Sequence, residues 1–462
     1  MSILLVIIAL SILIVVHEFG HYLAARWMGV HVEVFSVGYG KRLIGKEIAG
    51  TDFRISAFPL GGYAKMYGDI TEDVASDMIK KQKKVAVEAV APEKEKEEVK
   101  EEIPIEKSFF HKKRWQRAII LIGGSVFNIL LAILFIWIAN LAGREIPAYK
   151  TEPPVLGGVV EGSPAEQAGL KAGDRILEIN GEKMETWEET EIYILINPKD
   201  KLSIEAKRNG DIITFSVQPK EVTKNKVGYI GLLRNIPLYV GSVIEGSEAE
   251  RMGLKEGDII KKINGQRINY WLEGVEKIGE SANKKISLVV ERDGKEMSLT
   301  GTPEPYENPE TKETEGKLGF IPTPPTTTKS YGILDGFAAS IQENIRYTKL
   351  FFVSLGKLLV GKLSIRTMSG PIEITRISLK VAEQGLLPLI FLMGFISLAL
   401  GIFNLLPIPM LDGGAIFIII LEGIRRKDFS LTTKERILQI GFLFIVALVV
   451  VIFYNDIVKL LF

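Results

Sequence analysis

Long runs of apolar residues alternate with polar stretches along the chain, and four runs are long enough to cross a bilayer as helices. They occupy residues 1–28, 118–142, 386–423 and 437–462. Basic residues cluster after the first run, before the second and between the last two, which indicates that these segments face the cytoplasm. The pattern predicts a four-span membrane protein with both termini outside.

The two segments between the first and second runs differ in character. Residues 29–70 alternate apolar and polar side chains and are interrupted by glycines, which is typical of short strands and hairpins. Such a sheet either contacts the bilayer or is a small cytoplasmic module that only anchors the span. Residues 71–117 are a charged cytoplasmic insert and a juxtamembrane segment, typical of a solvated helix or a linker without chemistry.

An internal repeat with a period of 84 residues fills the region between the second and third runs. Each copy carries G-S-x-A-E-x-x-G-L, beginning at Gly162 and Gly246, followed by G-D and I-N-G. This pattern resembles the PDZ domain. The resemblance implies two α+β domains, at residues 150–235 and 236–322, in which a peptide can add as an extra strand.

Three further segments lie in this region. Residues 226–230 and 317–321 match each other in sequence, and we interpret them as groove-edge loops or as ordinary terminal strands. Residues 330–382 mix apolar and basic positions and predict helices that lie on the membrane surface.

Composition narrows the chemistry. The 57 basic and 56 acidic residues nearly cancel, so nothing indicates a nucleic-acid partner. The chain has no cysteine, which excludes disulfides and cysteine-rich zinc sites. Any metal must therefore be held by histidine and carboxylate.

The first apolar run contains the motif H-E-x-x-H, with His17, Glu18 and His21. On a helix the two histidines lie one turn apart on one face, where both can bind one metal, and Glu18 can act on a water molecule. Such a match can arise by chance, but two of only four histidines fall here, inside an apolar helix. A zinc site also needs a third protein ligand.

The best candidate for this third ligand is Asp412. It lies in the third run within N-L-L-P-I-P-M-L-D-G-G, where prolines and glycines break the helix at membrane depth. In the second run, Gly123, Gly124 and Ser125 would let another helix approach closely, and Asn128 either orients the metal site or serves helix packing.

Together, these motifs and the tandem PDZ-like repeats resemble the bacterial site-2 proteases of the regulator-of-sigma-E type. The resemblance implies an α-helical four-span metalloprotease core with a membrane-associated β-sheet and two extracytoplasmic PDZ domains. It also implies location in the bacterial inner membrane. The expected activity is zinc-dependent intramembrane cleavage of a single-span membrane protein, such as an anti-sigma factor, after a first extracytoplasmic cut.

By this resemblance, His17, His21 and Asp412 bind Zn²⁺, and Glu18 is the general base and later the proton donor. Residues 61–66 resemble the family's membrane-associated β-loop, which implies that Gly61, Gly62 and Tyr63 contact an extended substrate strand. Asn404 is expected to hydrogen-bond the substrate backbone or the developing oxyanion, or else to stabilise the proline-rich turn.

The chain departs from the family pattern at Ala399, Ala415 and Ser125. The first departure puts one substrate contact in doubt, the second removes a frequent histidine beside the site, and the third is a packing change. An alternative function is a catalytically inactive, membrane-anchored PDZ scaffold. A transporter with broken helices fits the third run but not the duplicated domains.

Overall fold

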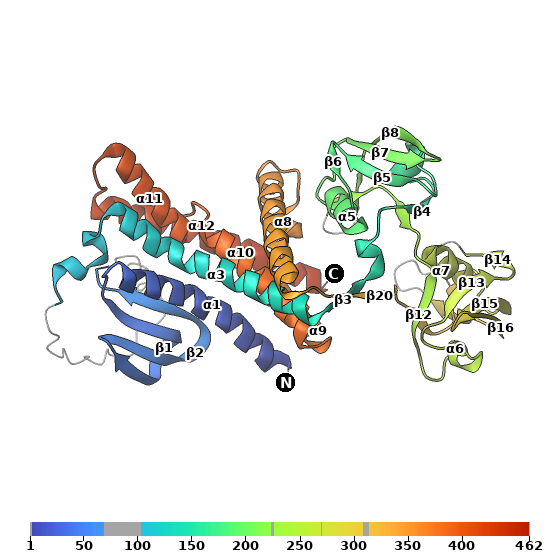
Figure 1. Cartoon of the computed structure of the whole chain (residues 1–462), viewed down its shortest axis with the longest axis horizontal. Coiled ribbons are helices and arrows are strands. Elements are labelled where there is room, and N and C mark those ends of the chain that lie inside the picture. Colours follow the sequence, from blue (N-terminus) through green and yellow to red (C-terminus); the bar gives the residue numbers. More distant parts are fainter. Residues whose placement is uncertain (1, 69–102, 223–225, 269, 308–313, 462) are drawn as a thin grey trace. The chain divides into compact units, whose positions relative to one another are not determined.

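The computed structural model describes residues 2–68, 103–222, 226–268, 270–307 and 314–461 (Figure 1). Most of the predicted charged insert therefore lies outside the described residues. The chain forms two compact units. The helical unit comprises Met1–Gly143, Ser330–Val353 and Met368–Phe462, and the repeat unit comprises Arg144–Lys329 and Ser354–Thr367.

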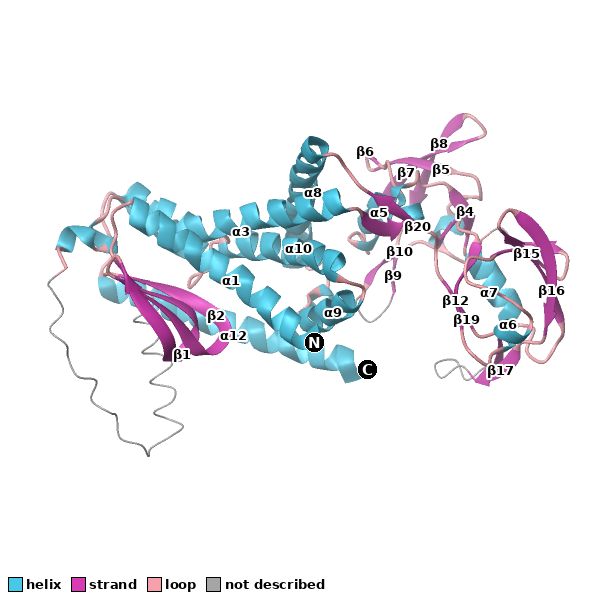
Figure 2. Ribbon diagram, turned by 60° about the horizontal axis from the view of Figure 1, so that its bottom comes forward, coloured by secondary structure: helices cyan, strands magenta, loops and turns pink. Residues whose placement is uncertain are grey.

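Four helices of the helical unit are long and apolar enough to cross a bilayer, counted over the described part of the chain. They are α1 (Ser2–Trp27), α3 (Arg114–Ala142), α10 (Leu386–Asn404) and α12 (Leu431–Leu461). Helices α1, α3 and α10 run side by side in Figures 1 and 2, with α3 in contact with both of the others.

Glycines bring α1 and α3 into close contact, which confirms the close approach predicted from Gly123 and Gly124. A Cβ atom at Gly20 would lie 2.4 Å from the carbonyl oxygen of Gly123, and one at Gly123 would lie 2.7 Å from that of Gly20. On the other side of α3, a Cβ at Gly401 of α10 would lie 3.0 Å from the oxygen of Ser125. Backbones this close leave no room for larger residues.

The segment after α1 forms two long strands, β1 (Val32–Ile48) and β2 (Thr51–Met66), rather than the short strands that the alternation predicts. Bulges interrupt both strands, so that different segments of β1 pair with different segments of β2. Residues 51–56 pair with both 42–48 and 34–37, whereas residues 62–66 pair with 32–37 along one edge. The glycines mark the bends of this twisted sheet, because they accommodate irregular backbone between otherwise continuous pairings.

The third apolar run consists of two helices. Helix α10 ends at Asn404, and α11 (Asp412–Arg425) begins after a tight loop. Gly413 and Gly414 pack on this loop, since a Cβ at either position would lie 2.2 Å from a loop carbonyl oxygen. The loop therefore delivers Asp412 as the first residue of a new helix.

One short helix is capped by the last apolar helix. Helix α9 (Pro371–Glu383) follows α8 (Ile333–Leu359), and its first backbone N–H groups point to Asp456 of α12. The Asp456 carboxylate accepts from the amides of Gly370 at 2.9 Å and of Ile372 and Glu373 at 3.1 Å. A side chain 73 positions beyond the end of α9 thus caps its N-terminus (456 − 383).

The repeat unit contains two similar domains with one strand and helix order. The first has a four-stranded sheet in the order β6-β5-β7-β8, and the second has a six-stranded sheet with the path β16-β15-β13-β12-β19. The elements of the first domain are β4 (Leu156–Val159), α4 (Pro164–Gln167), β5 (Arg175–Ile179), β6 (Glu182–Lys183), α5 (Trp187–Leu195), β7 (Leu202–Arg208), β8 (Asp211–Val217), β9 (Lys220–Val222), β10 (Val227–Tyr229) and β11 (Leu232–Arg234).

The second domain repeats this series. Its elements are β12 (Leu238–Val243), α6 (Glu248–Arg251), β13 (Ile259–Ile263), β14 (Gln266–Arg267), α7 (Trp271–Gly279), β15 (Ile286–Arg292), β16 (Lys295–Gly301), β17 (Glu304–Glu307), β18 (Thr314–Lys317) and β19 (Phe320–Pro322). Strands β3 (Arg144–Pro147) and β20 (Thr326–Lys329) pair where the chain enters and leaves the unit. Short 3-10 turns lie at Ile105–Lys107, Phe109–His111, Ala148–Thr151 and Ile365–Thr367.

An ion pair between a buried aspartate and a partly exposed arginine recurs in both copies. Asp174 is fully buried and accepts two hydrogen bonds from Arg208, at 2.6 and 2.7 Å. Asp258 and Arg292, 84 positions later, have the same geometry and the same distances. The aspartate of each G-D motif thus ties its turn to a central strand, and the identical geometry supports a duplicated fold.

The predicted equivalence of residues 226–230 in the first domain with 317–321 in the second is wrong: the first segment must be shifted by three positions. The carbonyl of Ile230 accepts from the first domain's small helix as that of Leu318 does in the second, so Gly231 corresponds to Gly319. Both glycines have positive φ, 86° and 85°, and both press on the capping serine of that helix. Contact with this serine, rather than the similarity of the two sequences, shows which positions of the two domains are equivalent. The strands that follow the two glycines, β11 and β19, are the terminal strands of the domains.

Candidate metal centre

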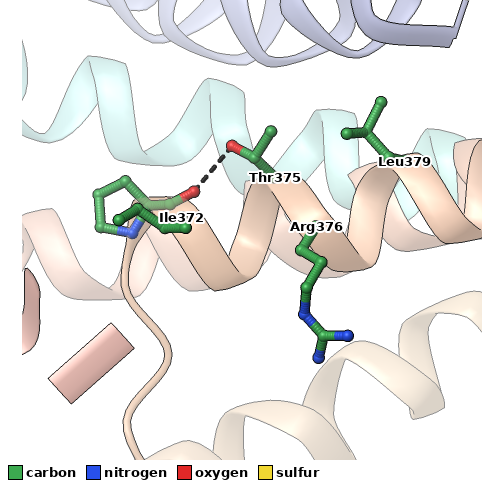
Figure 3. Close-up of a pocket in the computed structure, with 5 residues that line it drawn as sticks. Ile372, Thr375, Arg376 and Leu379 are labelled. Carbon is green, nitrogen blue, oxygen red and sulfur yellow. Dashed lines mark hydrogen bonds between the residues drawn. The ribbon is translucent and has the colours of Figure 1, made fainter. Parts of the chain in front are cut away.

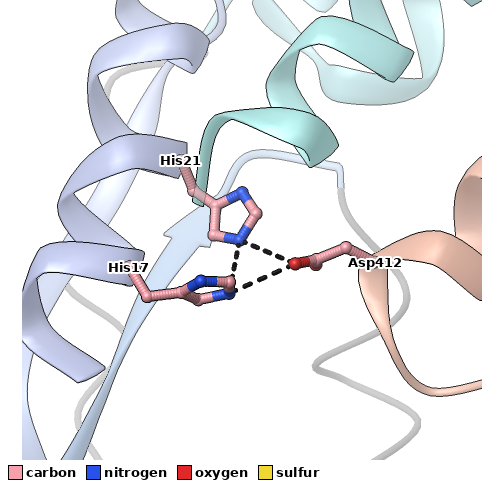
Figure 4. A group of neighbouring side chains, drawn as sticks. All are labelled: His17, His21 and Asp412. Carbon is pink, nitrogen blue, oxygen red and sulfur yellow. Dashed lines mark hydrogen bonds and ion pairs between the residues drawn. The ribbon is translucent and has the colours of Figure 1, made fainter. Parts of the chain in front are cut away.

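His17 and His21 lie one turn apart on α1 and are both buried, with 8% and 6% of their surface exposed (Figure 4). Their Nε2 atoms are 3.2 Å apart, and the rings meet nearly at right angles. The two imidazoles therefore direct the same ring atom to one point.

Asp412 completes this arrangement from the start of α11 (Figure 4). Its Oδ2 atom lies 3.2 Å from Nε2 of His17 and 3.3 Å from Nε2 of His21. Donor atoms that sit on one zinc ion at tetrahedral angles are separated by roughly 3.3 Å. The three side chains thus have the spacing, the atom types and the burial of a zinc site.

Gly124 of α3 makes room for these rings. A Cβ atom there would lie 2.4 Å from Nε2 of His21 and 2.7 Å from Cε1 of His17. The lack of a side chain at this position therefore serves the two histidines as well as helix packing.

The other ring nitrogens contact α3. Nδ1 of His21 lies 2.9 Å from the carbonyl oxygen of Ile120, and Nδ1 of His17 lies 3.3 Å from the side-chain nitrogen of Asn128. The Ile120 contact gives no signal in the sequence, because every residue has a carbonyl group. The amide nitrogen of Asn404, at the end of α10, lies 3.3 Å from Nε2 of His17.

Glu18 faces the edge of the sheet. Its carboxylate lies beside the backbone N–H of Ala64 in β2. A Cβ at the neighbouring Gly62 would lie 3.7 Å from Cγ of Glu18 and 2.7 Å from the carbonyl oxygen of Ser36. The segment that follows the glycine pair therefore runs directly past the glutamate of the motif.

The remaining residues of this segment contact Tyr39 of β1. The ring of Tyr63 stacks on that of Tyr39, with centroids 5.9 Å apart. Gly61 has a φ of 109°, and a Cβ there would lie 2.4 Å from the Tyr39 ring. The structure thus brings Gly62 next to Glu18, whereas Gly61 and Tyr63 pack within the sheet.

A pocket lies elsewhere, on one face of α9 (Figure 3). It is lined by Pro371, Ile372, Thr375, Arg376 and Leu379, and none of the cluster residues contributes to it. Thr375 donates to the carbonyl of Pro371 at 2.7 Å, a bond within the helix. Within the described part of the chain, His17, His21 and Asp412 are the one group of three or more possible metal ligands that lie together, and this pocket is separate from them.

An H-E-x-x-H helix whose histidines meet a carboxylate from a second apolar segment defines the class of membrane metalloproteases. Comparison with known families agrees, because the model of peptidase family M50 matches residues 5–448. The chain belongs to peptidase family M50. It is a zinc-dependent, site-2-type metalloprotease and a membrane protein, and its two repeats carry the PDZ-like sequence pattern.

Similar proteins match over nearly their full length. A regulator of sigma E protease from Haemophilus influenzae is 31% identical over 477 residues, 98% of each chain. The regulator of sigma-E protease RseP from Salmonella typhimurium is 30% identical over 478 residues, also 98% of each. Among solved structures, a PDZ domain of an SdrC-like protein from Listeria monocytogenes covers 19% of this chain and 87% of its own, at 18% identity. Its TM-score of 0.17 is too low to bear on the fold.

Proposed function

We propose that the protein is an intramembrane endopeptidase in which His17, His21 and Asp412 bind zinc and Glu18 is the general base. The observation that carries this proposal is the spacing of 3.2, 3.2 and 3.3 Å among the three ligand atoms. Zinc supplies Lewis-acid chemistry at such a site, since it polarises the scissile carbonyl and makes water more acidic.

The Glu18 carboxylate lies close enough to His17, His21 and Asp412 to interact with them electrostatically, so it can take a proton from water beside the ligand cluster and return it to the leaving amine. The Ala64 amide beside the carboxylate supports this role, because a backbone N–H at this place can orient the carboxylate without using a side chain. A side chain at Gly62 would clash with the backbone of Ser36 and reach Cγ of Glu18 at 3.7 Å, so the glycine leaves the space next to the glutamate open.

We further propose that residues 61–63 receive the substrate as an extended strand. Residues 62–66 pair with β1 on one side, and among the described residues no strand pairs with their other edge. A substrate must unwind there, because helical carbonyls are masked by their own hydrogen bonds. The position of Asn404, 3.3 Å from His17, supports hydrogen bonding to the substrate carbonyl or the oxyanion.

The proposed setting is the bacterial inner membrane, crossed four times, with both termini and the PDZ pair outside the cytoplasm. Basic residues around the apolar runs support this orientation. The proposed substrates are single-span membrane proteins of the anti-sigma factor type, cut after a first extracytoplasmic cleavage. The names of the Haemophilus and Salmonella proteins support this substrate class. We propose that the PDZ domains bind peptides or exclude substrates with bulky outer domains.

The test compares Glu18→Gln with the unchanged enzyme on a model single-span substrate in detergent or liposomes. Cleavage should fall by several orders of magnitude while the zinc content stays the same. Glu106→Gln, at an exposed site on a 3-10 turn, is the matched control and should cleave normally. Undiminished cleavage by Glu18→Gln would refute the mechanism. If neither variant nor the parent cleaves any substrate but zinc is bound, the inactive PDZ scaffold is favoured.

A further inference from the structure

The two histidines are oriented by different kinds of group on α3. A neutral imidazole that binds a metal through Nε2 must carry its proton on Nδ1, and that N–H needs an acceptor. For His21 the acceptor is the carbonyl oxygen of Ile120, 2.9 Å away. A carbonyl can only accept, so this contact alone fixes the tautomer of His21.

For His17 the partner is a carboxamide side chain, which has an oxygen that accepts hydrogen bonds and an NH2 group that donates them. Nδ1 of His17 lies 3.3 Å from Nδ2 of Asn128, a residue with 1% of its surface exposed. If this nitrogen donated to Nδ1, the ring proton would sit on Nε2, facing Asp412 and His21. That arrangement is incompatible with metal binding through Nε2.

The two ends of a carboxamide have nearly the same shape, and a half-turn about its last bond exchanges them. The Oδ1 atom of Asn128 has no hydrogen-bond partner within the described part of the chain, so no bond opposes this turn. We propose that Asn128 presents its oxygen to the Nδ1–H of His17 and thereby holds this ring in the tautomer whose Nε2 binds zinc. Asn128 is then a positioning residue, and the inference rests on the ligand set proposed above.

The surroundings of Asn128 support this role over helix packing. The bond that joins α3 to α10 at this level uses the backbone oxygen of Asn128, which accepts from the buried hydroxyl of Ser397 at 2.8 Å. Its Cβ packs on Gly401, where an added methyl group would lie 3.2 Å away. Helix packing thus needs no amide at residue 128, and these two contacts hold residue 128 where its amide faces His17.

The experiment measures zinc affinity by competition with a chelator on the purified, detergent-solubilised full chain. Asn128→Leu keeps the approximate shape and removes the acceptor, so the zinc dissociation constant should rise about 10- to 100-fold. Asn128→Asp keeps an acceptor in the same place and cannot donate when ionised, so affinity should stay within a few-fold of the parent. If Asn128→Leu does not fold, Asn128→Ala takes its place, because it also removes the acceptor and should raise the zinc dissociation constant.

Asn140→Leu is the matched control. This asparagine is fully buried on the same helix, twelve positions further along, and its side-chain atoms also have no hydrogen-bond partner among the described residues. Its loss should leave zinc affinity unchanged. The cobalt-substituted protein gives a second readout, because the visible spectrum of Asn128→Leu should change and that of Asn140→Leu should not.

Three results decide between the inference and its alternatives. Asn128→Leu with unchanged zinc affinity would overturn it, and so would an aspartate variant as defective as the leucine variant, since the latter result indicates a donor. His21→Ala should abolish zinc binding. If it does not, the ligand set itself is wrong, whereas loss in His21→Ala with no loss in Asn128→Leu rejects only the role of Asn128.

Discussion

Gly124→Ala should disable the metal centre by adding a single methyl group. The new Cβ would lie 2.4 Å from Nε2 of His21 and 2.7 Å from Cε1 of His17. Ordinary contact begins near 3.4 Å, so the rings must retreat by about 1.0 and 0.7 Å. Metal sites hold their ligand distances to within roughly 0.2 Å. The displacement is several times this tolerance.

We therefore expect zinc affinity to fall by at least about 100-fold, the upper end of what the loss of an outer-sphere partner causes. The assay is chelator competition with metal analysis of the purified variant. Cleavage of a single-span substrate should fall in parallel and recover in part at high zinc concentration, because the ligands themselves are intact.

Two further alanine variants separate the metal site from helix packing. Gly123→Ala places a Cβ 2.7 Å from the oxygen of Gly20 and 3.0 Å from Ala24, so it strains the same helix contact without meeting a histidine. Gly123→Ala should therefore lower the melting temperature while zinc affinity changes little. Gly423→Ala, on the helix of Asp412, meets nothing within 4 Å and should change neither. Normal zinc affinity in Gly124→Ala, or an equal loss in Gly123→Ala, would refute the reasoning.

Three other predictions concern the repeat unit. Asp174→Asn weakens the ion pair between the buried Asp174 and the partly exposed Arg208, so it should destabilise the first repeat domain by about 1–3 kcal/mol, seen as faster hydrogen exchange there and unchanged exchange in the second domain. Deletion of residues 150–322 should release cleavage of substrates that keep their outer domain; unchanged selectivity in a competition assay would exclude the size filter. The Thr302 amide donates to Glu248 and, together with Arg251, lowers the pKa of this carboxyl. The resulting stability is present at neutral pH and lost as the pH falls through this lowered pKa, so melting curves of Glu248→Gln should depend less on acidification.

The sequence predicted the cluster because its chemistry is carried by side chains. A zinc site at H-E-x-x-H requires a third protein ligand, and the chain has no cysteine. Asp412 lies in an apolar run that is broken by prolines and glycines, and basic residues place it towards the same side of the membrane as the motif. The glycines of the second run likewise predicted a close helix contact, since only small residues permit it. These inferences needed residue types and spacing, but no coordinates.

Backbone groups and registers could not be predicted in this way. The oxygen of Ile120 and the amide of Ala64 contact the site, yet neither depends on the identity of the residue. The three-position error between the PDZ repeats arose because glycine recurs in both segments, and only contact with the capping serine shows which glycine is equivalent. The length of β1 and β2 was also hidden, because bulges interrupt the alternation without ending the strands.

The cap that Asp456 provides for α9 has a consequence for biogenesis. Helix α9 leaves the ribosome well before Asp456 is synthesised, so its first amides have no such acceptor while the chain is being inserted. The start of α9 can reach its final structure only after the last helix has been made and has packed against it. A chain truncated before Asp456 would therefore retain the H-E-x-x-H motif and Asp412 but lack this final step of assembly, which quality-control proteases could recognise by the unprotected N-terminus of α9.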